Sequence, residues 1–342
     1  MTSVTAPMQE EVTTLKERRL ERLLGPQWAR LVRGVLTNPL SVTGLILVML
    51  FILTGIFAPV LAPPPNANWD SNLIPRDGFR SEPRPPMTEW TRNIPAYVPG
   101  WYSLITGRDE WVHILGTTDG QYDIWYGIVW GTRTALTVGV IVVFISATVG
   151  ILIGSLAGFY GGFVDTLLMR VVEIFSAFPF LVAVLVLASI LVPRLGQSLL
   201  PAIIALVVFG WMGYARQVRG DILTVKEQEY VQAARASGAS DFRLILQHIL
   251  PNSIFPTMVI ISLDMGSIVL SFAALSFLGV GAPVGYADWG QIVARARSWI
   301  LTLDQQWYII VFPGIALLLY GMGWNLIGDA LRDILDPKLR GS

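Results

Sequence analysis

Six long apolar stretches, separated by polar and charged segments, dominate the hydrophobic pattern of the chain. A helix needs roughly 20 mostly apolar residues to cross about 30 Å of hydrocarbon, and each stretch is close to that length. The sequence therefore predicts an all-α integral membrane protein with six transmembrane helices. The spans are expected at about 39–62, 135–158, 172–193, 199–215, 255–280 and 307–328, with a tight hairpin at 193–198 between the third and the fourth.

The lysines and arginines indicate how these spans are oriented. Basic residues precede the first span, follow the fourth and end the chain, and short loops rich in Lys and Arg stay in the cytoplasm. We therefore expect a multi-pass protein of the cytoplasmic (inner) membrane with both termini cytoplasmic. The loop after the first span would be external, because so long a loop crosses the membrane largely regardless of its charge. The basic residues are Lys16, Arg18, Arg19, Arg22, Arg30 and Arg33, then Arg216, Arg219, Lys226, Arg235 and Arg243, and finally Arg332, Lys338 and Arg340.

The polar segments complete the expected organisation. Over residues 12–36, basic side chains alternate with Leu, Trp and Val, which is typical of an amphipathic helix on the inner membrane surface. The external loop is rich in proline and tryptophan. It is either a docking surface or lid for an external partner, or a small folded cap with aromatic residues at the membrane interface. The expected parts are a cytoplasmic N-terminal segment (1–38), the first span (39–62), the external loop (63–134), a five-helix core (135–330) with a cytoplasmic loop (216–254), and a cytoplasmic tail (331–342).

Residues 229–253, EYVQAARASGASDFRLILQHILPNS, form a polar, small-residue segment between two apolar spans. The stretch before Gly238 lacks helix breakers, and Gly238 suits a left-handed helix C-cap. Ser240 can cap the N-terminus of a second helix, with Asp241 placed favourably in its first turn. The sequence therefore predicts two short helices hinged at Gly238, which is more structure than a turn between spans requires.

The two helices are expected to present different faces. In the second helix, Phe242, Ile245, Leu246 and Ile249 fall at i, i+3, i+4 and i+7, which predicts one buried apolar stripe ended by Pro251. The first helix would expose the small residues Ala233, Ala234 and Ala236 to the cytoplasm. Such a surface lets another protein approach closely, which favours a mechanical contact over catalysis.

A small residue recurs at every fourth position of the second span, at Gly150, Gly154 and Gly158. Such a row allows another helix to approach closely. It predicts a helix-packing face.

Composition narrows the classes of function. The chain has 342 residues, of which 53% are hydrophobic and 14% charged, whereas soluble domains carry roughly 25% charged residues. The net charge is zero, so nothing indicates a nucleic-acid partner. There is no cysteine, and the two histidines, His113 and His248, are too few and too distant in sequence for a metal cluster.

The segment 229–253 resembles the EAA loop of ABC-importer permeases through Gln232-Ala233-Ala234, Gly238 and Ile249-Leu250-Pro251. In that family the loop is the coupling helix that sits in a cleft of the ATP-binding subunit. Gln232 stands where the family usually has glutamate, so it can form hydrogen bonds but carries no charge for a salt bridge. The resemblance implies ATPase-coupling residues at Glu229, Tyr230, Gln232, Ala233, Ala234, Ser237, Gly238, Ala239, Ser240 and Asp241.

Further motifs extend the resemblance along nearly the whole chain from about residue 30, to the C-type subunit of the dipeptide, oligopeptide and nickel permeases. These motifs are NPLSVTGLILVMLFILTGIFAPVLAP (38–63), HILGTTDGQYD (113–123), AGFYGGFVDTLLMR (157–170), SFLGVG (276–281), DWGQIV (288–293), FPG (312–314) and GDALRDILDPKLR (328–340).

The resemblance implies the partners of the chain. They are a second, homologous permease, two ABC ATPase subunits, an extracellular or periplasmic substrate-binding protein, and membrane lipid. The chain would be a non-catalytic subunit without a cofactor, with ATP and Mg on its partners, and the sequence contains no G-x-x-x-x-G-K-[ST] phosphate loop. The implied substrates are di- or oligopeptides, and nickel complexes or oligosaccharides are alternatives.

The residues bear on two other classes of protein. A secondary transporter driven by an ion gradient depends on ionisable residues within its spans. Asp264, about nine residues into the fifth span, is the clearest example. It is either a pore-lining or gating group that contacts a substrate amine, or a hydrogen-bonded packing residue. An intramembrane enzyme is disfavoured, because both histidines fall in loops and cannot activate a serine within the membrane.

Overall fold

The computed structural model describes residues 34–95 and 98–335, so the expected amphipathic helix at 12–36 lies almost wholly outside the described residues. The long helices are α3 (Pro39–Ile56), α6 (Ile124–Tyr160), α7 (Gly162–Ser176), α8 (Phe180–Leu195), α9 (Leu199–Gly210), α10 (Met212–Val225), α14 (Phe255–Phe277) and α17 (Tyr308–Leu335). The short elements are α4 (Ala58–Leu61), β1 (Thr88–Glu89), α5 (Gly100–Thr106), β2 (Val112–His113), η1 (Asp119–Gln121), α11 (Glu229–Ala236), α12 (Asp241–Arg243), η2 (Leu244–Ile249), α13 (Leu250–Ser253), α15 (Trp289–Arg295), η3 (Ala296–Thr302) and α16 (Leu303–Gln306).

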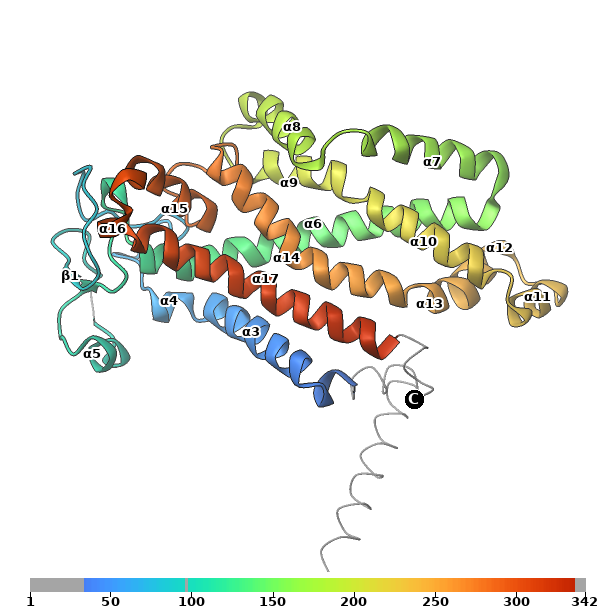
Figure 1. Ribbon diagram of the computed structural model, residues 1–342, viewed down its shortest axis with the longest axis horizontal. Helices are drawn as coiled ribbons and strands as arrows, with labels where there is room; N and C mark the ends of the chain where they lie inside the picture. Colours follow the sequence, from blue (N-terminus) through green and yellow to red (C-terminus); the bar gives the residue numbers. More distant parts are fainter. Residues whose placement is uncertain (1–33, 96–97, 336–342) are drawn as a thin grey trace, which may run out of the picture.

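The described chain contains five helices that are long and apolar enough to cross a membrane, and α7 with α8 supplies a sixth crossing if this bent pair is one span. This confirms the predicted all-α membrane class. Helices α3, α17 and α14 run side by side, with α17 between α14 and α3 (Figure 1).

The span predicted at 172–193 is not one continuous helix. The chain breaks between Ser176 and Phe180, and α7 and α8 meet there at 83°. The cause is local: Phe178 precedes Pro179, and the proline ring disfavours helical geometry in the residue before it. The break leaves irregular backbone within the expected span.

Two helices continue beyond the apolar stretches that predicted them. The 37 residues of α6 correspond to about 55 Å, well above the thickness of the hydrocarbon layer. It begins at Ile124, where the side chain of Asp123 accepts a hydrogen bond from the backbone N–H of Tyr126 at 2.6 Å. Helix α10 runs on to Val225, so the loop expected to begin at 216 is helical for its first ten residues. Both helices therefore extend beyond the apolar residues that predicted them.

The glycine row of α6 lies against α10. A Cβ added at Gly150 would be 2.4 Å from Cβ of Tyr214, and one at Gly154 would be 2.5 Å from the carbonyl oxygen of Ala215. At Gly158 the nearest atom would be the carbonyl oxygen of Arg219, at 3.0 Å. Side chains at these three positions would push the helices apart, so the row fixes α10 on α6.

Most of the segment between α3 and α6 folds into a small cap at one end of the bundle, beside α15 and α16 (Figure 1). Antiparallel β1 and β2 pair Thr88 with His113 and Glu89 with Val112. A cluster of buried apolar residues lies beneath them: Trp90, Tyr102, Trp111 and Val112. The proline- and tryptophan-rich loop is thus a folded cap with its own core.

Candidate coupling loop and intramembrane cavity

Helix α11 lies at the end of the bundle opposite the cap (Figure 1). One buried residue, Val231, anchors it to the rest of the protein. Val231 belongs to a core cluster with Val218 and Ile222 of α10, Phe159 of α6, and Leu244 and Ile249 of the following segment. The helix is therefore held on the ends of α6 and α10, and movement of α11 would be transmitted directly to these two long helices.

Gly238 ends α11 with a left-handed turn. Its φ is +85°, a conformation that glycine adopts without steric cost. The backbone N–H of Gly238 donates to the carbonyl of Arg235 at 3.0 Å, and that of Ala239 donates to the carbonyl of Ala234 at 3.1 Å. This pair of bonds defines a Schellman motif. The chain therefore reverses sharply between α11 and α12, as the sequence predicts.

The segment after Gly238 differs from the predicted amphipathic helix. Ser240 occupies the N-cap position, but its side chain makes no capping hydrogen bond. Residues Leu244–Ile249 form a π-helix, in which hydrogen bonds join residues i and i+5. This changes the face that is buried: Leu244 and Ile249, five residues apart, are buried, whereas Phe242 is 73% and Leu246 45% exposed. The expected stripe is therefore wrong at Phe242 and Leu246.

The expected coupling residues form one exposed surface around this reversal. Ala233 and Ala236 are exposed, whereas Ala234 turns partly toward the core cluster. Apolar surface is added by Tyr230, Phe242 and Leu246, all exposed. Sequence reasoning assigned Phe242 to the interior and so left it out of this exposed surface. The other exposed candidates are Glu229, Gln232, Ser237, Gly238, Ser240 and Asp241, and Ala239 is half-buried.

The glutamine that replaces the usual glutamate has a specific partner. Nε2 of Gln232 donates to the backbone carbonyl of Lys226 at 3.2 Å, a bond that a carboxylate cannot make because it has no donor. Nζ of Lys226 in turn donates to the carbonyl of Gly158 at 3.0 Å. These two bonds connect α11 through the end of α10 to the end of α6.

A cavity of about 480 Å³ lies where the α7–α8 break faces α10 and α14. Its walls combine aromatic side chains of the break with polar groups of the helices. The polar lining residues are Ser176, Arg216, Asp264, Ser267 and Ser271.

Asp264 is half-buried, and its Oδ1 lies 3.3 Å from Oγ of Ser267, whose single proton is shared with the backbone carbonyl of Leu263 at 3.0 Å. The buried hydroxyl of Tyr214 lies close to the same carboxylate but makes no well-aligned bond with it. The nearby pair of Asp165 and Arg219 differs, because the guanidinium binds both carboxylate oxygens, with Nη2 2.6 Å from Oδ2.

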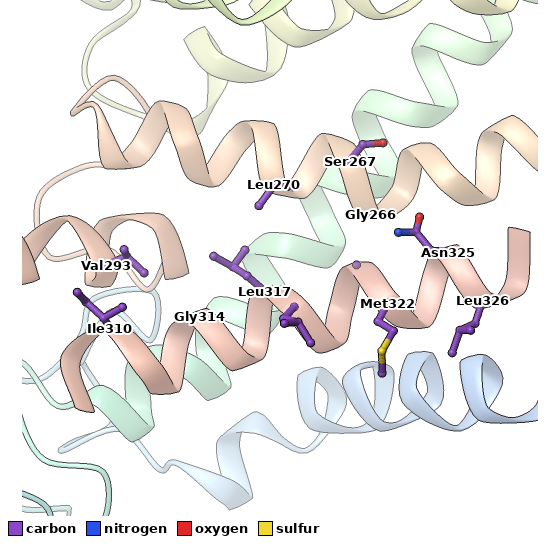
Figure 2. A pocket seen from close by; sticks show the side chains of 12 residues that line it. Gly266, Ser267, Leu270, Val293, Ile310, Gly314, Leu317, Met322, Asn325 and Leu326 are labelled. Carbon is purple, nitrogen blue, oxygen red and sulfur yellow. The ribbon is translucent and has the colours of Figure 1, made fainter. Parts of the chain in front are cut away.

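A second groove, of about 770 Å³, runs between α14 and α17 and is almost entirely apolar. Figure 2 shows Leu270 of α14 and Leu317 of α17 lining it from facing helices. Ser267 lines both the groove and the polar cavity.

The cap contains a buried charged cluster that sequence reasoning missed. Nδ1 of His113 is 2.7 Å from Oδ2 of Asp123, and Nε2 is 3.2 Å from Oδ2 of Asp77. Arg84 also binds Asp77. Burial opposes the charge on His113, but the hydrogen bonds to Asp123 and Asp77 outweigh it and raise the histidine pKa. Burial likewise opposes the charge on Asp77, yet the bonds from His113, Thr91 and Arg92 hold its pKa below the usual value.

Two family models match the sequence. Residues 150–341 match the binding-protein-dependent transport system inner membrane component, and residues 26–77 match the N-terminal TM domain of oligopeptide transport permease C. The first match covers more than half of the chain, which therefore belongs to the family of binding-protein-dependent transport system inner membrane components. This confirms the resemblance to ABC-importer permeases and the multi-pass location in the inner membrane.

Several relatives match almost end to end. The probable D,D-dipeptide transport system permease protein DdpC of Escherichia coli (strain K12) is 35% identical over 334 residues, 98% of each chain. The dipeptide transport system permease protein DppC of Alkalihalophilus pseudofirmus is 34% identical over 314 residues, 92% of this chain and 90% of the relative. DppC of Bacillus subtilis is 33% identical over 313 residues, 92% of this chain and 85% of the relative.

A solved structure shares the fold. A chain of the MetNI methionine ABC transporter, in an inward-facing conformation, superposes with a TM-score of 0.51 and 19% sequence identity. The match covers 62% of this chain and 97% of that chain. At this identity the likeness extends to the fold alone, and it confirms the helical permease architecture.

Proposed function

We propose that this chain is the permease subunit of an ATP-driven importer of di- or oligopeptides, coupled to its ATPases through the exposed surface around α11. The observation that carries the proposal is the construction of that surface. Small residues lie on α11, which Val231 and Gln232 fasten to α10, and the exposed Phe242 lies on α12, just after the reversal at Gly238. The near full-length similarity to dipeptide permeases supports peptides as the substrate class.

The proposal assigns the remaining roles to partners. Two ATPase subunits bind ATP and Mg and receive α11 in a cleft, and a substrate-binding protein delivers peptide on the external side. A second, homologous permease completes the pathway, and the apolar groove between α14 and α17 supports a helix of that subunit as its occupant. The loop around α11 and both termini then face the cytoplasm, and the folded cap faces outward.

ATP-driven closure of the ATPases would move α11, and with it the ends of α6 and α10 to which its buried residues are attached. The spans would then rock between inward- and outward-facing states around the pathway shared with the second permease. This mechanism requires α11 and the core cluster beneath it to move together.

The absence of cysteine from the chain permits a direct test. Ser240→Cys places a single thiol on the exposed surface near α11, and Ser81→Cys places a matched thiol on the exposed cap. In native membranes we expect Ser240→Cys to crosslink to an ABC ATPase and Ser81→Cys to react with impermeant reagents from outside.

Labelling of Ser240→Cys from outside alone would overturn the orientation. A cytoplasmic thiol at position 240 that never captures an ATPase would overturn the coupling role. An uptake activity that survives ATP depletion but is abolished by an ionophore would show that an ion gradient drives transport instead.

A further inference from the structure

Asp264 and Arg216 line the same intramembrane cavity with opposite charges. Within the described part of the chain no ion pair forms between them, and neither pairs with another charged side chain. The hydrogen bond from Ser267, one turn away, supplies Asp264 with a neutral donor. Asp264 and Arg216 therefore line the same cavity with opposite charges and form no ion pair with each other.

A charged residue within a span is costly unless a partner compensates it, and intramembrane ionisable residues usually mark substrate pathways. Helix α10 carries two arginines one turn apart, one with a charged partner among the described residues and one without. Arg219 is bound at two nitrogens by Asp165, which is the geometry of a structural ion pair. Arg216 has no such partner among the described residues and faces the cavity instead. The contrast indicates that Asp264 and Arg216 serve a ligand.

The cavity has further features of a ligand site. Its volume of about 480 Å³ falls within the roughly 300–1,000 Å³ typical of small-molecule pockets. The break at Ala177–Pro179 contributes its flanking residues to the wall. Irregular backbone at membrane depth is tolerated where it is buried or lines a cavity, and broken helices form the substrate sites of several transporters.

We infer that this cavity is an intramembrane peptide site, in which Asp264 accepts hydrogen bonds from the α-ammonium group of the passing peptide and Arg216 binds its carboxylate. This inference rests on the proposed function. An ammonium group has three donors and no acceptor, and an ionised carboxylate is acceptor-only, so the two match. The planar guanidinium of Arg216 suits two-point binding of a carboxylate.

The test uses the absence of cysteine from this chain, with the partner subunits prepared as cysteine-free variants. Ser271→Cys places a thiol in the cavity, two turns from Asp264 on α14. In the complete transporter, reconstituted in vesicles, its modification by cationic 2-aminoethyl methanethiosulfonate is compared with that by anionic 2-sulfonatoethyl methanethiosulfonate. The ratio of the two rates reports local charge, because any change in the ionisation of the thiol affects both reactions equally.

We expect Asp264→Asn to lower the cationic-to-anionic rate ratio by about tenfold, the scale of one nearby unit charge in a partly screened site. Asp264→Glu should largely preserve the ratio. The matched control is Ser240→Cys, whose ratio should not respond to Asp264→Asn because this thiol lies outside the cavity. Millimolar L-alanyl-L-alanine should slow the modification of Ser271→Cys, and its N-acetyl derivative, which lacks the ammonium group, should not.

The outcomes separate this inference from the proposed function. If the parent transporter accumulates alanyl-alanine with ATP, but Asp264→Asn changes neither the rate ratio nor the protection by peptide, the inference alone is overturned. If Asp264→Asn instead releases the second permease during purification, Asp264 is a packing residue between subunits, and the inference is again overturned. Absence of ATP-driven peptide uptake by the parent transporter would overturn the proposed function, whatever the charge ratio.

Discussion

Arg219 on α10 binds Asp165 on α7 through two nitrogens, with Nη2 2.6 Å from Oδ2. The pair joins helices whose residues are 54 positions apart in sequence. Because the glycine row already fixes α10 on α6, the ion pair adds α7 to this unit at the end nearest the coupling loop. Helix α7 therefore has its N-terminal end held by a charged contact and its C-terminal end at the intramembrane cavity.

Removing this pair should destabilise the protein. Arg219→Gln should lower the free energy of unfolding by about 1.5–3 kcal/mol, the usual range for a hydrogen bond to a charged group. The matched control is Arg170→Gln: Arg170 forms an exposed pair with Glu173 on α7, and such pairs contribute about 0–1 kcal/mol. Thermal unfolding of the two variants in detergent measures the difference. Equal decreases in the unfolding temperature of the two variants would show that the Asp165–Arg219 pair stabilises the protein no more than the exposed pair does.

The sequence predicted the features that depend on local pattern and missed those that depend on contacts between distant segments. Apolar stretches located the membrane helices, and Gly238 located the reversal after α11. Apolar character alone could not show that α10 continues to Val225, because helical hydrogen bonding does not require apolar side chains. The 3.6-residue period also failed to anticipate the π-helix Leu244–Ile249, in which Leu246 is exposed, and the exposure of Phe242 just before it.

Separation along the chain explains why sequence reasoning missed the charged cluster of the cap. His113 and Asp123 begin and end the same motif, so their contact had a local signal. Asp77 lies 36 residues before His113 and reaches it through the folding of the cap, which no spacing rule describes. The cavity near Asp264 likewise depends on the bend between α7 and α8, two helices that the hydrophobic pattern merged into one.

Substitutions at Gly238 should separate strain from loss of coupling. An added Cβ would meet no atom within 4 Å, so Gly238→Ala suffers only from the positive φ, a cost of about 1–2 kcal/mol. Gly238→Pro is incompatible with this φ and removes the N–H that donates to the carbonyl of Arg235.

We therefore expect a transporter with Gly238→Ala to retain peptide transport. In a transporter with Gly238→Pro, the ATPase subunits should hydrolyse ATP without movement of substrate. The measurement is the ratio of peptide uptake to ATP hydrolysis in vesicles. Normal transport by Gly238→Pro would contradict the proposed coupling role.

Phe242 should contribute to the affinity for the ATPase and little to folding. Because the side chain is 73% exposed, Phe242→Ala should change the stability of the isolated subunit by no more than about 0.5 kcal/mol. Loss of an aromatic anchor at an interface costs about 2 kcal/mol, which corresponds to roughly thirtyfold weaker binding. Leu104→Ala is the control, since Leu104 is similarly exposed on α5 of the cap.

The readout for Phe242 is binding of the purified ATPase to the permease in lipid nanodiscs. Weakened binding in both variants, or in neither, would show that Phe242 is not an ATPase contact.

The charged cluster of the cap should make its stability depend on pH. His113 has its pKa raised above 6.5 because the bonds to Asp123 and Asp77 outweigh burial, so its contribution is complete below pH 6.5 and is lost as the pH rises through the raised value. For Asp77 burial is likewise outweighed by its hydrogen bonds, and the pKa is lowered. Its contribution is therefore complete above pH 3.8 and is lost as the pH falls through the lowered value. Together the two groups predict greatest stability of the cap between about pH 4 and 6.5.

Hydrogen exchange at β1 and β2 measures this dependence after correction for the intrinsic effect of pH on exchange. Because Thr88 pairs with His113 in the β1–β2 register, protection of these strands should fall as the pH rises above 6.5 and the histidine loses its proton. His113→Gln cannot be protonated in this range and should give a flat profile, with lower protection at pH 6 than the parent protein. His248→Gln changes the chain's other histidine, which lies in η2 outside the cap, and should leave the profile unchanged. A pH-dependent loss of protection that persists in His113→Gln would assign the effect to another group.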